Sequence, residues 1–294
     1  AALKRRLAEI APLRTDLLPV RAEAAALARE AQAEGREVVL ASASDIRLVR
    51  SLAEAHGLSN RVFASDGARN LKGRAKAAAL VEAYGEGGFD YLGDSPADEP
   101  VWAAAREAHA VGAAGGAADR RRAAGQTVHA LPGGFRRRDL ARALRPHQWV
   151  KNVLLFLPMI AAHDLSLDTL GHVLLGILAF SLAASSIYVV NDLLDLEADR
   201  LHEEKRHRPF ASGAVPLGAG MATGAGVGLL ALFLGGALGP PFLFTLVLYM
   251  ALSLGYSLRL KRMRWVDIAT LAMLYTLRVV AGAAASGLEA SIYI

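Results

Sequence analysis

A change in composition near the middle of the 294-residue chain constrains the fold more than any other feature. Up to about residue 143 the chain is charged and rich in Ala and Arg, whereas beyond Val150 it is dominated by Leu, Ala, Gly, Val and Ile. Apolar stretches that reach or approach the length of a bilayer span lie at about 150–162, 170–190, 215–238, 241–258 and 265–285. The sequence therefore predicts a soluble part followed by an all-α transmembrane bundle.

The positive charges predict how the bundle is oriented. They gather at the entry to the first apolar stretch and in the second and fourth connections, around 136–151, 200–208 and 259–264, while 163–168 and 235–241 contain no Lys or Arg. By the positive-inside rule, the basic connections and the soluble part are cytoplasmic, and the protein is expected in the cell inner membrane.

Charge and cysteine content narrow the function classes. The formal net charge is +5, and most of the surplus lies beside the apolar stretches without interleaved aromatic residues. An anionic lipid surface or a phosphorylated substrate is therefore the expected partner, and nucleic acid is not. The chain has no cysteine, so disulfides and thiolate metal sites are excluded.

An acidic cluster follows the second apolar stretch. On one continuous helix Asn191, Asp192, Asp195 and Asp199 would fall within about 100° of one another and face one cavity. Three carboxylates in an apolar setting repel one another unless they share a cation, and such oxygen ligands suit Mg²⁺. The bases that follow would supply counter-charge for an anionic substrate: Arg200, Lys205, Arg206 and Arg208. The alternative is a solvated, charged loop between helices.

The last apolar stretch carries an unusual buried charge. Asp267, Tyr275 and Arg278 fall within about 80° of one another on a helix, and Arg278 lies well inside the stretch. A charge there costs at least ~2.5 kcal/mol, so the arginine should face the interior of the bundle. It would either line a polar cavity or form a structural pair with an acid or backbone carbonyls. Asp267 would either serve the site or cap its helix.

From about 144 to 294 the chain resembles the UbiA superfamily of intramembrane prenyltransferases. Asn191, Asp192, Asp195 and Asp199 match its first acidic signature, and the stretches 145–152 and 205–213 look like the branch of polyprenyl-phosphate phosphoribosyltransferases. This resemblance implies Mg²⁺ on the three aspartates, phosphoribosyl diphosphate as donor and a polyprenyl phosphate as acceptor. It also implies cavity roles for Lys151 and Asn152. A second acidic motif would lie beyond Ile294.

Two alternatives to this reaction stay open. One is an aromatic prenyltransferase that uses a polyprenyl diphosphate on the same bundle. The other is a non-catalytic transporter or scaffold that binds lipid phosphates. Both alternatives use the same acidic cluster and basic connection.

The soluble part shows strand, loop and helix units. A strand at 37–41 ends in Ser42-Ala-Ser-Asp45 before a helix at 46–56, and a second unit ends in 91–98 before a helix at about 100–108. A helix that opens at 70–76 carries lysines. Polar side chains at the carboxyl ends of parallel strands mark the ligand edge of an open α/β sheet.

This order, over about 12–116, resembles the haloacid dehalogenase-like (HAD) hydrolases, mostly Mg²⁺-dependent phosphatases with an aspartyl-phosphate intermediate. Ser42 or Ser44 would match the phosphate-binding hydroxyl, Lys76 or its rival Lys72 the third-motif lysine, and Asp94 and Asp98 the acidic motif, with Asp94 on the metal. The Asp-x-Asp loop of the family is missing: if the start is truncated, it belongs upstream of Ala1, and if it is not, this part cannot perform the reaction. Alternatively, Ser42 caps a helix and the two acids are solvated.

The expected organisation is an incomplete HAD-like α/β domain at 1–116, a linker with a basic amphipathic helix at 117–143, and a UbiA-like bundle at 144–294. The Gly-, Ala- and Arg-rich stretch 112–134 suggests the linker, and 135–145 suggests the helix. Because the chain starts within a helical pattern and stops at the start of an apolar one, we expect a fragment.

Overall fold

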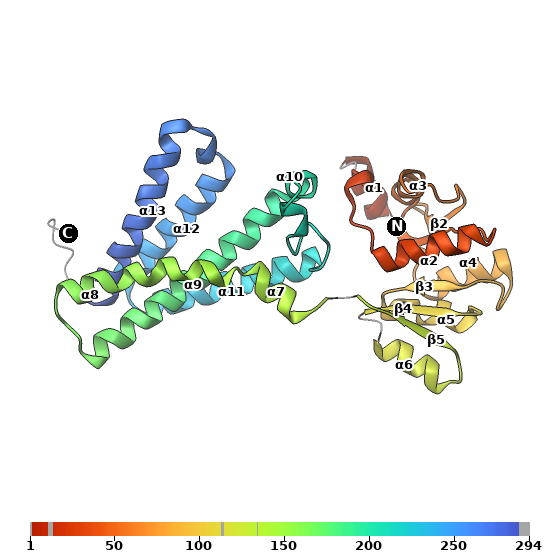
Figure 1. Cartoon of the computed structure of the whole chain (residues 1–294), viewed down its shortest axis with the longest axis horizontal. Coiled ribbons are helices and arrows are strands. Elements are labelled where there is room, and N and C mark those ends of the chain that lie inside the picture. Colours follow the sequence, from red (N-terminus) through yellow and green to blue (C-terminus); the bar gives the residue numbers. More distant parts are fainter. Residues whose placement is uncertain (1, 11–13, 113–114, 134, 288–294) are drawn as a thin grey trace. The chain divides into compact units, whose positions relative to one another are not determined.

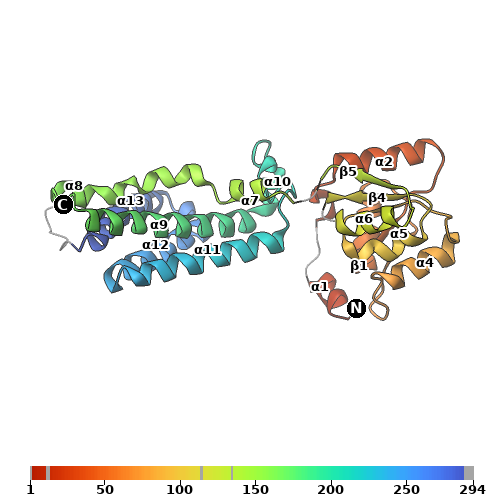
Figure 2. The ribbon, with the colours of Figure 1, turned by 90° about the horizontal axis from the view of Figure 1, so that it is seen from below.

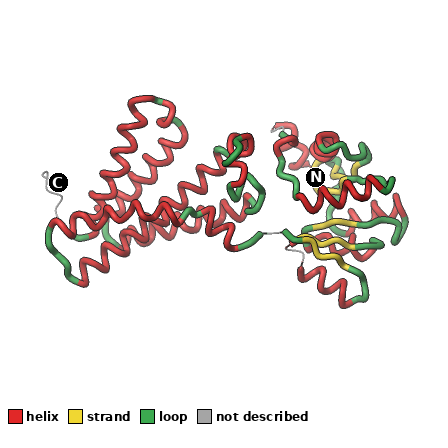
Figure 3. The backbone as a smooth tube through the Cα atoms, viewed as in Figure 1, coloured by secondary structure: helices red, strands yellow, loops and turns green. Residues whose placement is uncertain are grey.

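The computed structural model describes residues 2–10, 14–112, 115–133 and 135–287. The chain forms two compact units, Ala1–Phe135 and Arg136–Ile294, and each is described by itself. In the described residues, strands occur in the first unit alone, and the second unit consists of helices joined by loops (Figure 3).

The first unit is an α/β domain with two parallel sheets (Figures 1 and 2). In one sheet, β1 (Leu40–Asp45) pairs with β2 (Val62–Ser65); in the other, the order is β3 (Tyr91–Gly93), β4 (Ala108–Val111) and β5 (Val128–Leu131). Parallel strands need crossover connections. The helices that precede or connect the strands are α1 (Ala2–Ile10), α2 (Ala22–Ala33), α3 (Ile46–Ala55), α4 (Arg74–Tyr84), α5 (Glu99–Ala104) and α6 (Gly115–Ala123), with short 3₁₀ turns η1 (Thr15–Leu17) and η2 (Pro96–Asp98).

One hydrophobic core holds this unit together. Trp102 and Val101 of α5 are fully buried, and Ala41 and Phe63 from the β1–β2 sheet pack against the same cluster. The stretch expected to be a linker contributes as well, because α6 and β5 lie within it and Val128 is buried in this core.

Strand β1 lies further along the chain than the sequence suggested. It begins at Leu40 and includes the whole Ser42–Asp45 segment, so Ser42 lies within the strand instead of the loop that follows it. The Asp45 side chain accepts a hydrogen bond from the backbone N–H of Arg47 and thereby caps α3. Ser42 is therefore not the cap of this helix.

The second unit is helical throughout its described part. It contains α7 (Arg137–Ala143), η4 (Pro146–Phe156), α8 (Leu157–Ala161), α9 (Leu167–Leu194), α10 (Leu196–Leu201), η5 (Lys205–His207), α11 (Leu217–Ala237), α12 (Pro240–Leu258), η6 (Leu260–Arg262) and α13 (Arg264–Ala285). Of these helices, α9, α11, α12 and α13 are long and apolar enough to cross a membrane. They confirm the predicted spans from 170 to 285, with ends displaced by a few residues, and the chain is an integral membrane protein.

The first apolar stretch takes another form. Residues Pro146–Phe156 wind as a 3₁₀ helix, and α8 continues it for five residues. A 3₁₀ helix rises about 2.0 Å per residue against about 1.5 Å in an α-helix, so η4 and α8 together extend over roughly 30 Å. A stretch that is short for an α-helical span is thereby lengthened to about the thickness of the hydrocarbon core.

Helix α9 lies at the centre of the unit and packs on η4, α11, α12 and α13 (Figures 1 and 2). Small residues let the neighbours come close: a Cβ at Gly224 or Gly228 of α11 would lie 2.9 Å from Val189 or 2.7 Å from Ser186. Large apolar side chains such as Phe233 point outward, as they do toward lipid. The core of the bundle is therefore built around α9.

Gly282 of α13 offers a test of this packing. A Cβ there would lie 2.2 Å from the Leu155 carbonyl oxygen of η4, so Gly282→Ala forces the backbones apart and should cost about 1–3 kcal/mol. Gly236→Ala, where the added Cβ meets open space, is the control. Thermal melting in detergent should show a lower midpoint for the first variant alone; equal midpoints would contradict the close approach.

Candidate active sites in the two units

The acidic cluster of the helical unit lies at a break between two helices. Helix α9 ends at Leu194, Asp195 adopts a non-helical conformation, and α10 begins at Leu196. The expectation of one continuous helix is therefore wrong. The break leaves Asp192 and Asp199 3% and 2% exposed, whereas Asp195 turns to Lys261 of η6, whose Nζ lies 3.1 Å from its carboxylate.

Two arginines hold the buried carboxylates. Arg208 Nη1 lies 2.7 Å from Asp199 Oδ2 and 3.4 Å from Asp192 Oδ1, and Arg145 Nη2 lies 2.5 Å from Asp192 Oδ1. Arg145 has a left-handed backbone with φ of 51°, which a non-glycine residue adopts only when its surroundings demand it. Its guanidinium also lies 5.2 Å from the centre of the Tyr188 ring.

Arg145 and Lys261 were not among the predicted site residues. Both lie in basic segments that the charge pattern singled out, but their pairing with Asp192 and Asp195 depends on which segments meet at the end of α9. The physical signal was available, because a carboxylate buried beside an apolar helix requires a cation nearby.

The donor set at this break suits a hard cation in part. Asp192 Oδ2 is buried without a hydrogen-bond partner, and Arg208 contacts both Asp192 and Asp199. Such oxygens suit Mg²⁺, which keeps waters and binds phosphate oxygens alongside one or two carboxylates. Among the described residues, however, no three His, Asp or Glu side chains are grouped closely enough to hold a metal ion. The arrangement fits a metal on Asp192 and Asp199, with Asp195 engaged elsewhere.

The remaining predicted residues around the break lie outside this cluster. Arg200 donates to the Ala211 carbonyl at 3.3 Å, and burial lowers the pKa of its guanidinium. Lys205 and Arg206 are exposed. Lys151 and Asn191 are half-buried, and neither side chain has a hydrogen bond among the described residues.

Arg278 lies deep in the bundle, 6% exposed, and its partners are neutral. It donates to Asn152 Oδ1 at 3.1 Å, to the Leu274 carbonyl at 2.6 Å and to the Tyr249 hydroxyl at 3.2 Å. The rings of Tyr249 and Tyr275 lie 5.0 and 5.3 Å from its guanidinium carbon. No described carboxylate lies within ion-pair distance of it, so of the structural alternatives the geometry matches hydrogen bonding to neutral groups.

The hydrogen-bonded group around this arginine joins α9 roughly three turns before the acidic cluster. Its partner Asn152, 1% exposed, donates to Ser181 Oγ at 2.9 Å, and Ser181 precedes Asp192 by eleven residues on α9. Eleven residues of α-helix measure roughly 16 Å. Asp267 accepts a hydrogen bond from the Tyr256 hydroxyl at 2.8 Å and joins neither cluster.

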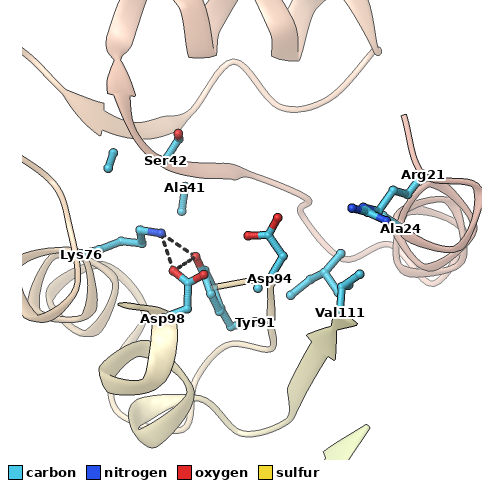
Figure 4. Close-up of a pocket in the computed structure, with 12 residues that line it drawn as sticks. Arg21, Ala24, Ala41, Ser42, Lys76, Tyr91, Asp94, Asp98 and Val111 are labelled. Atoms are coloured by element: carbon cyan, nitrogen blue, oxygen red, sulfur yellow. Dashed lines mark hydrogen bonds and ion pairs between the residues drawn. The ribbon is translucent and has the colours of Figure 1, made fainter. Parts of the chain in front are cut away.

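The α/β unit contains a cavity of about 280 Å³ between β1 and β3, which belong to different sheets (Figure 4). All four residues predicted for the HAD-like site line it: Ser42, Lys76, Asp94 and Asp98. Lys76 is buried, whereas its rival Lys72 is exposed. Residues far apart in the sequence are thus brought to one cavity, as their order suggested.

A buried ion pair forms one wall of this cavity. Lys76 Nζ lies 2.8 Å from Asp98 Oδ1, and the Tyr91 hydroxyl bonds both, at 2.8 and 3.1 Å. Burial, and next the charge of Asp98, raise the pKa of the Tyr91 phenol, so it stays protonated and can donate. A Cβ at Gly93 would lie 2.9 Å from Asp98 Oδ2, so this glycine makes room for the carboxylate.

The cavity wall also contains two polar side chains that were not predicted: Tyr91 and Arg21. Tyr91 begins the 91–98 segment, and its inward position in a short strand could have identified it as a residue of the site. Arg21 precedes α2 and carries no local signal, because only the tertiary fold brings the start of α2 to this edge of the sheets.

The second unit is thus a bundle of membrane-spanning helices with buried acids and paired bases at the break between α9 and α10. These features define an integral membrane protein with a polar site at one end of a long apolar helix. The comparison with known families is specific. Residues 152–293 match the model of the UbiA prenyltransferase family.

The relatives cover different parts of the chain. The uncharacterized protein y4nM of Sinorhizobium fredii is 38% identical over 99% of this chain and 57% of its own length. The decaprenyl-phosphate phosphoribosyltransferases of Corynebacterium glutamicum and Mycobacterium tuberculosis are 42% and 37% identical, each over 52% of this chain and over 47% and 52% of their own lengths. The chain thus spans about half the length of these relatives.

A solved structure of a UbiA homolog from Archaeoglobus fulgidus, bound to GPP and Mg²⁺, aligns with a TM-score of 0.45 and 23% identity over 52% of this chain and 56% of that one.

Removing the cation of the buried ion pair tests the cavity wall of the α/β unit. Lys76→Met leaves the Asp98 carboxylate buried beside a neutral side chain, which should cost about 3–5 kcal/mol. Adding Asp98→Asn should recover a large part of that loss, because no charge then stays uncompensated. Urea unfolding followed by tryptophan fluorescence, to which the fully buried Trp102 contributes, would measure both. If Lys76→Met alone were as stable as the parent, the pair would be solvated.

Proposed function

We propose that the helical unit is a Mg²⁺-dependent transferase that moves phosphoribosyl from phosphoribosyl diphosphate to a polyprenyl phosphate. The observation that carries the proposal is the pair of buried carboxylates, Asp192 and Asp199, joined through Arg208 and flanked by Arg145. The names of the relatives that match this half of the chain favour phosphoribosyl transfer over transfer of a prenyl group.

The reaction breaks the bond between ribose C1 and the diphosphate and forms one between C1 and a phosphate oxygen of the lipid. C1 becomes cationic as the diphosphate departs, so negative charge grows on the leaving oxygens. Mg²⁺ held by Asp192 and Asp199, and by Asp195 once it leaves Lys261, would supply a Lewis acid for those oxygens. Arg145, Arg208 and Lys261 already stand at these carboxylates and bind the phosphates as the donor enters.

The expected position of this site is the cytoplasmic face of the membrane. Asp192 lies near the end of α9, beside connections that carry the basic residues, so the helix break opens on the positively charged side of the bundle. A phosphorylated sugar donor would reach the site from the cytoplasm, while the lipid acceptor enters from the bilayer.

Neutralising either buried carboxylate should abolish the transferase reaction. In membranes supplied with radiolabelled phosphoribosyl diphosphate and polyprenyl phosphate, Asp192→Asn and Asp199→Asn should lower labelled lipid by about 10²-fold or more. Glu197→Gln is the control, because Glu197 lies between the two aspartates in sequence but is exposed. Full activity of both aspartate variants would remove the site assignment.

The same assay distinguishes the alternatives. Product formed only from a polyprenyl diphosphate and an aromatic acid would assign the aromatic prenyltransferase reaction to this site. Lipid phosphate binding without turnover of either substrate pair would indicate a transporter or scaffold.

Removing divalent cations tests the metal assignment separately. EDTA should stop labelled lipid formation and added MgCl₂ should restore it, because without the cation the two buried aspartates repel the diphosphate. Unchanged turnover in EDTA would show that the arginines alone neutralise the negative charge on the leaving diphosphate.

For the α/β unit we propose a phosphatase on the cavity between β1 and β3. The supporting observation is that Ser42, Lys76, Asp94 and Asp98 meet there from segments spread over more than fifty residues. Ser42 and Lys76 would bind the phosphate, and Asp94 and Asp98 would hold Mg²⁺.

Phosphate binding tests this second proposal without requiring turnover. Isothermal titration of the full chain with ribose 5-phosphate should show binding that Ser42→Ala weakens about fivefold or more, since a hydroxyl contact to a charged group contributes roughly 1–3 kcal/mol. Ser59→Ala, a hydroxyl bonded to Glu37 on the surface, is the matched control. Identical affinity of the Ser42 and Ser59 variants would argue against a phosphate site at β1.

A further inference from the structure

The cavity of the α/β unit has a second basic residue that the phosphatase proposal does not use. Arg21, at the start of α2, lines the wall on the side of Val111, and Figure 4 shows its guanidinium turned toward the cavity with Asp94 between it and Lys76. Lys76 is already paired with Asp98, whereas among the described residues Arg21 makes no hydrogen bond or ion pair. Arg21 is therefore a cation of this wall that the contacts around Lys76 and Asp98 leave unused.

The surroundings position this guanidinium. A Cβ at Gly133, just after β5, would lie 2.8 Å from Arg21 Nη1 and 2.8 Å from Val111 Cγ1, so any larger residue would displace the arginine. Gly133 has a φ of 146°, in the region that favours glycine. The arginine thus passes over the carboxyl ends of β4 and β5, the edge at which open α/β sheets bind ligands.

We propose that this cavity takes a sugar phosphate that carries a second anionic group, and that Arg21 recognises that second group. The inference rests on the phosphatase proposed above, and it names the substrate class: the phosphorylated lipid that the helical unit would form. That product carries a phosphomonoester on ribose C5 and a phosphodiester that joins C1 to the lipid. Ser42 and Lys76 bind the monoester, and Arg21 binds the diester across the ribose.

The proposed step is a hydrolysis and needs water alone as co-reactant. The bond between phosphorus and the C5 oxygen breaks, an oxygen from water bonds to the phosphorus, and the C5 oxygen leaves with a proton. No group is oxidised or reduced. The lipid keeps its diester and its ribose, so the negative charge that Arg21 binds is the same before and after the reaction.

Two soluble probes separate the roles of the cations. Ribose 5-phosphate carries the monoester alone, and geranylphosphoryl-ribose 5-phosphate carries both groups. Titrated against the full chain in detergent, the second probe should bind roughly tenfold tighter or more, as expected for a charge-assisted contact. Arg21→Ala should remove this margin and leave ribose 5-phosphate binding within about twofold, while Arg21→Lys should keep part of it.

Arg29→Ala is the matched control, because Arg29 is an exposed arginine on the same helix whose side chain bonds only the Ala25 carbonyl among the described residues. The role of Arg21 would be overturned if the Arg21→Ala variant still bound the two-group probe more tightly than ribose 5-phosphate. It would also be overturned if Arg29→Ala removed this difference in affinity equally. Equal affinity of the parent chain for both probes would overturn the substrate class while ribose 5-phosphate binding upholds the phosphate site. If Ser42→Ala leaves ribose 5-phosphate binding unchanged, the phosphatase proposal itself fails.

Discussion

Charge compensation at the end of α9 is the constraint on which the helical unit depends. Asp192 and Asp199 are buried where an apolar helix stops, and burying a carboxylate without a partner is costly. Arg145 from the entry segment and Arg208 from the connection before α11 supply the opposing charge. These pairs join three separate segments of chain, so the same contacts that make the site also fix the start of η4 and the path into α11.

Hydropathy predicted the four long helices of the second unit, because a bilayer requires long apolar helices. Hydropathy did not predict the break at Asp195, since every residue from 191 to 199 accepts helical geometry, and the Lys261 that meets Asp195 lies 66 residues further along the chain. The sequence did not predict the 3₁₀ form of η4 either, because the composition of this stretch suits an α-helix. Its form depends on packing against α9 and α13.

In the α/β unit, the order of polar residues after strands predicted the cavity better than it predicted the strands themselves. Ser42, Lys76, Asp94 and Asp98 meet although β1 was placed three residues too early. Strand β5 was missed because four residues of mixed character in a Gly- and Arg-rich stretch show no periodicity, and only pairing with β4 makes them a strand. Arg21 could not be found for the same reason, because its position depends on nonlocal packing.

The neutral partners of Arg278 have a consequence for how the protein is made. A helix that carries an arginine near its middle enters a bilayer poorly by itself, whereas α13 finds the Asn152 amide and the Tyr249 hydroxyl on segments that are synthesised earlier. The order of synthesis then matters, because η4 and α12 must already be in the membrane when α13 leaves the translocon. The first effect of substitutions at Asn152 or Tyr249 would therefore be impaired insertion of α13 into the membrane.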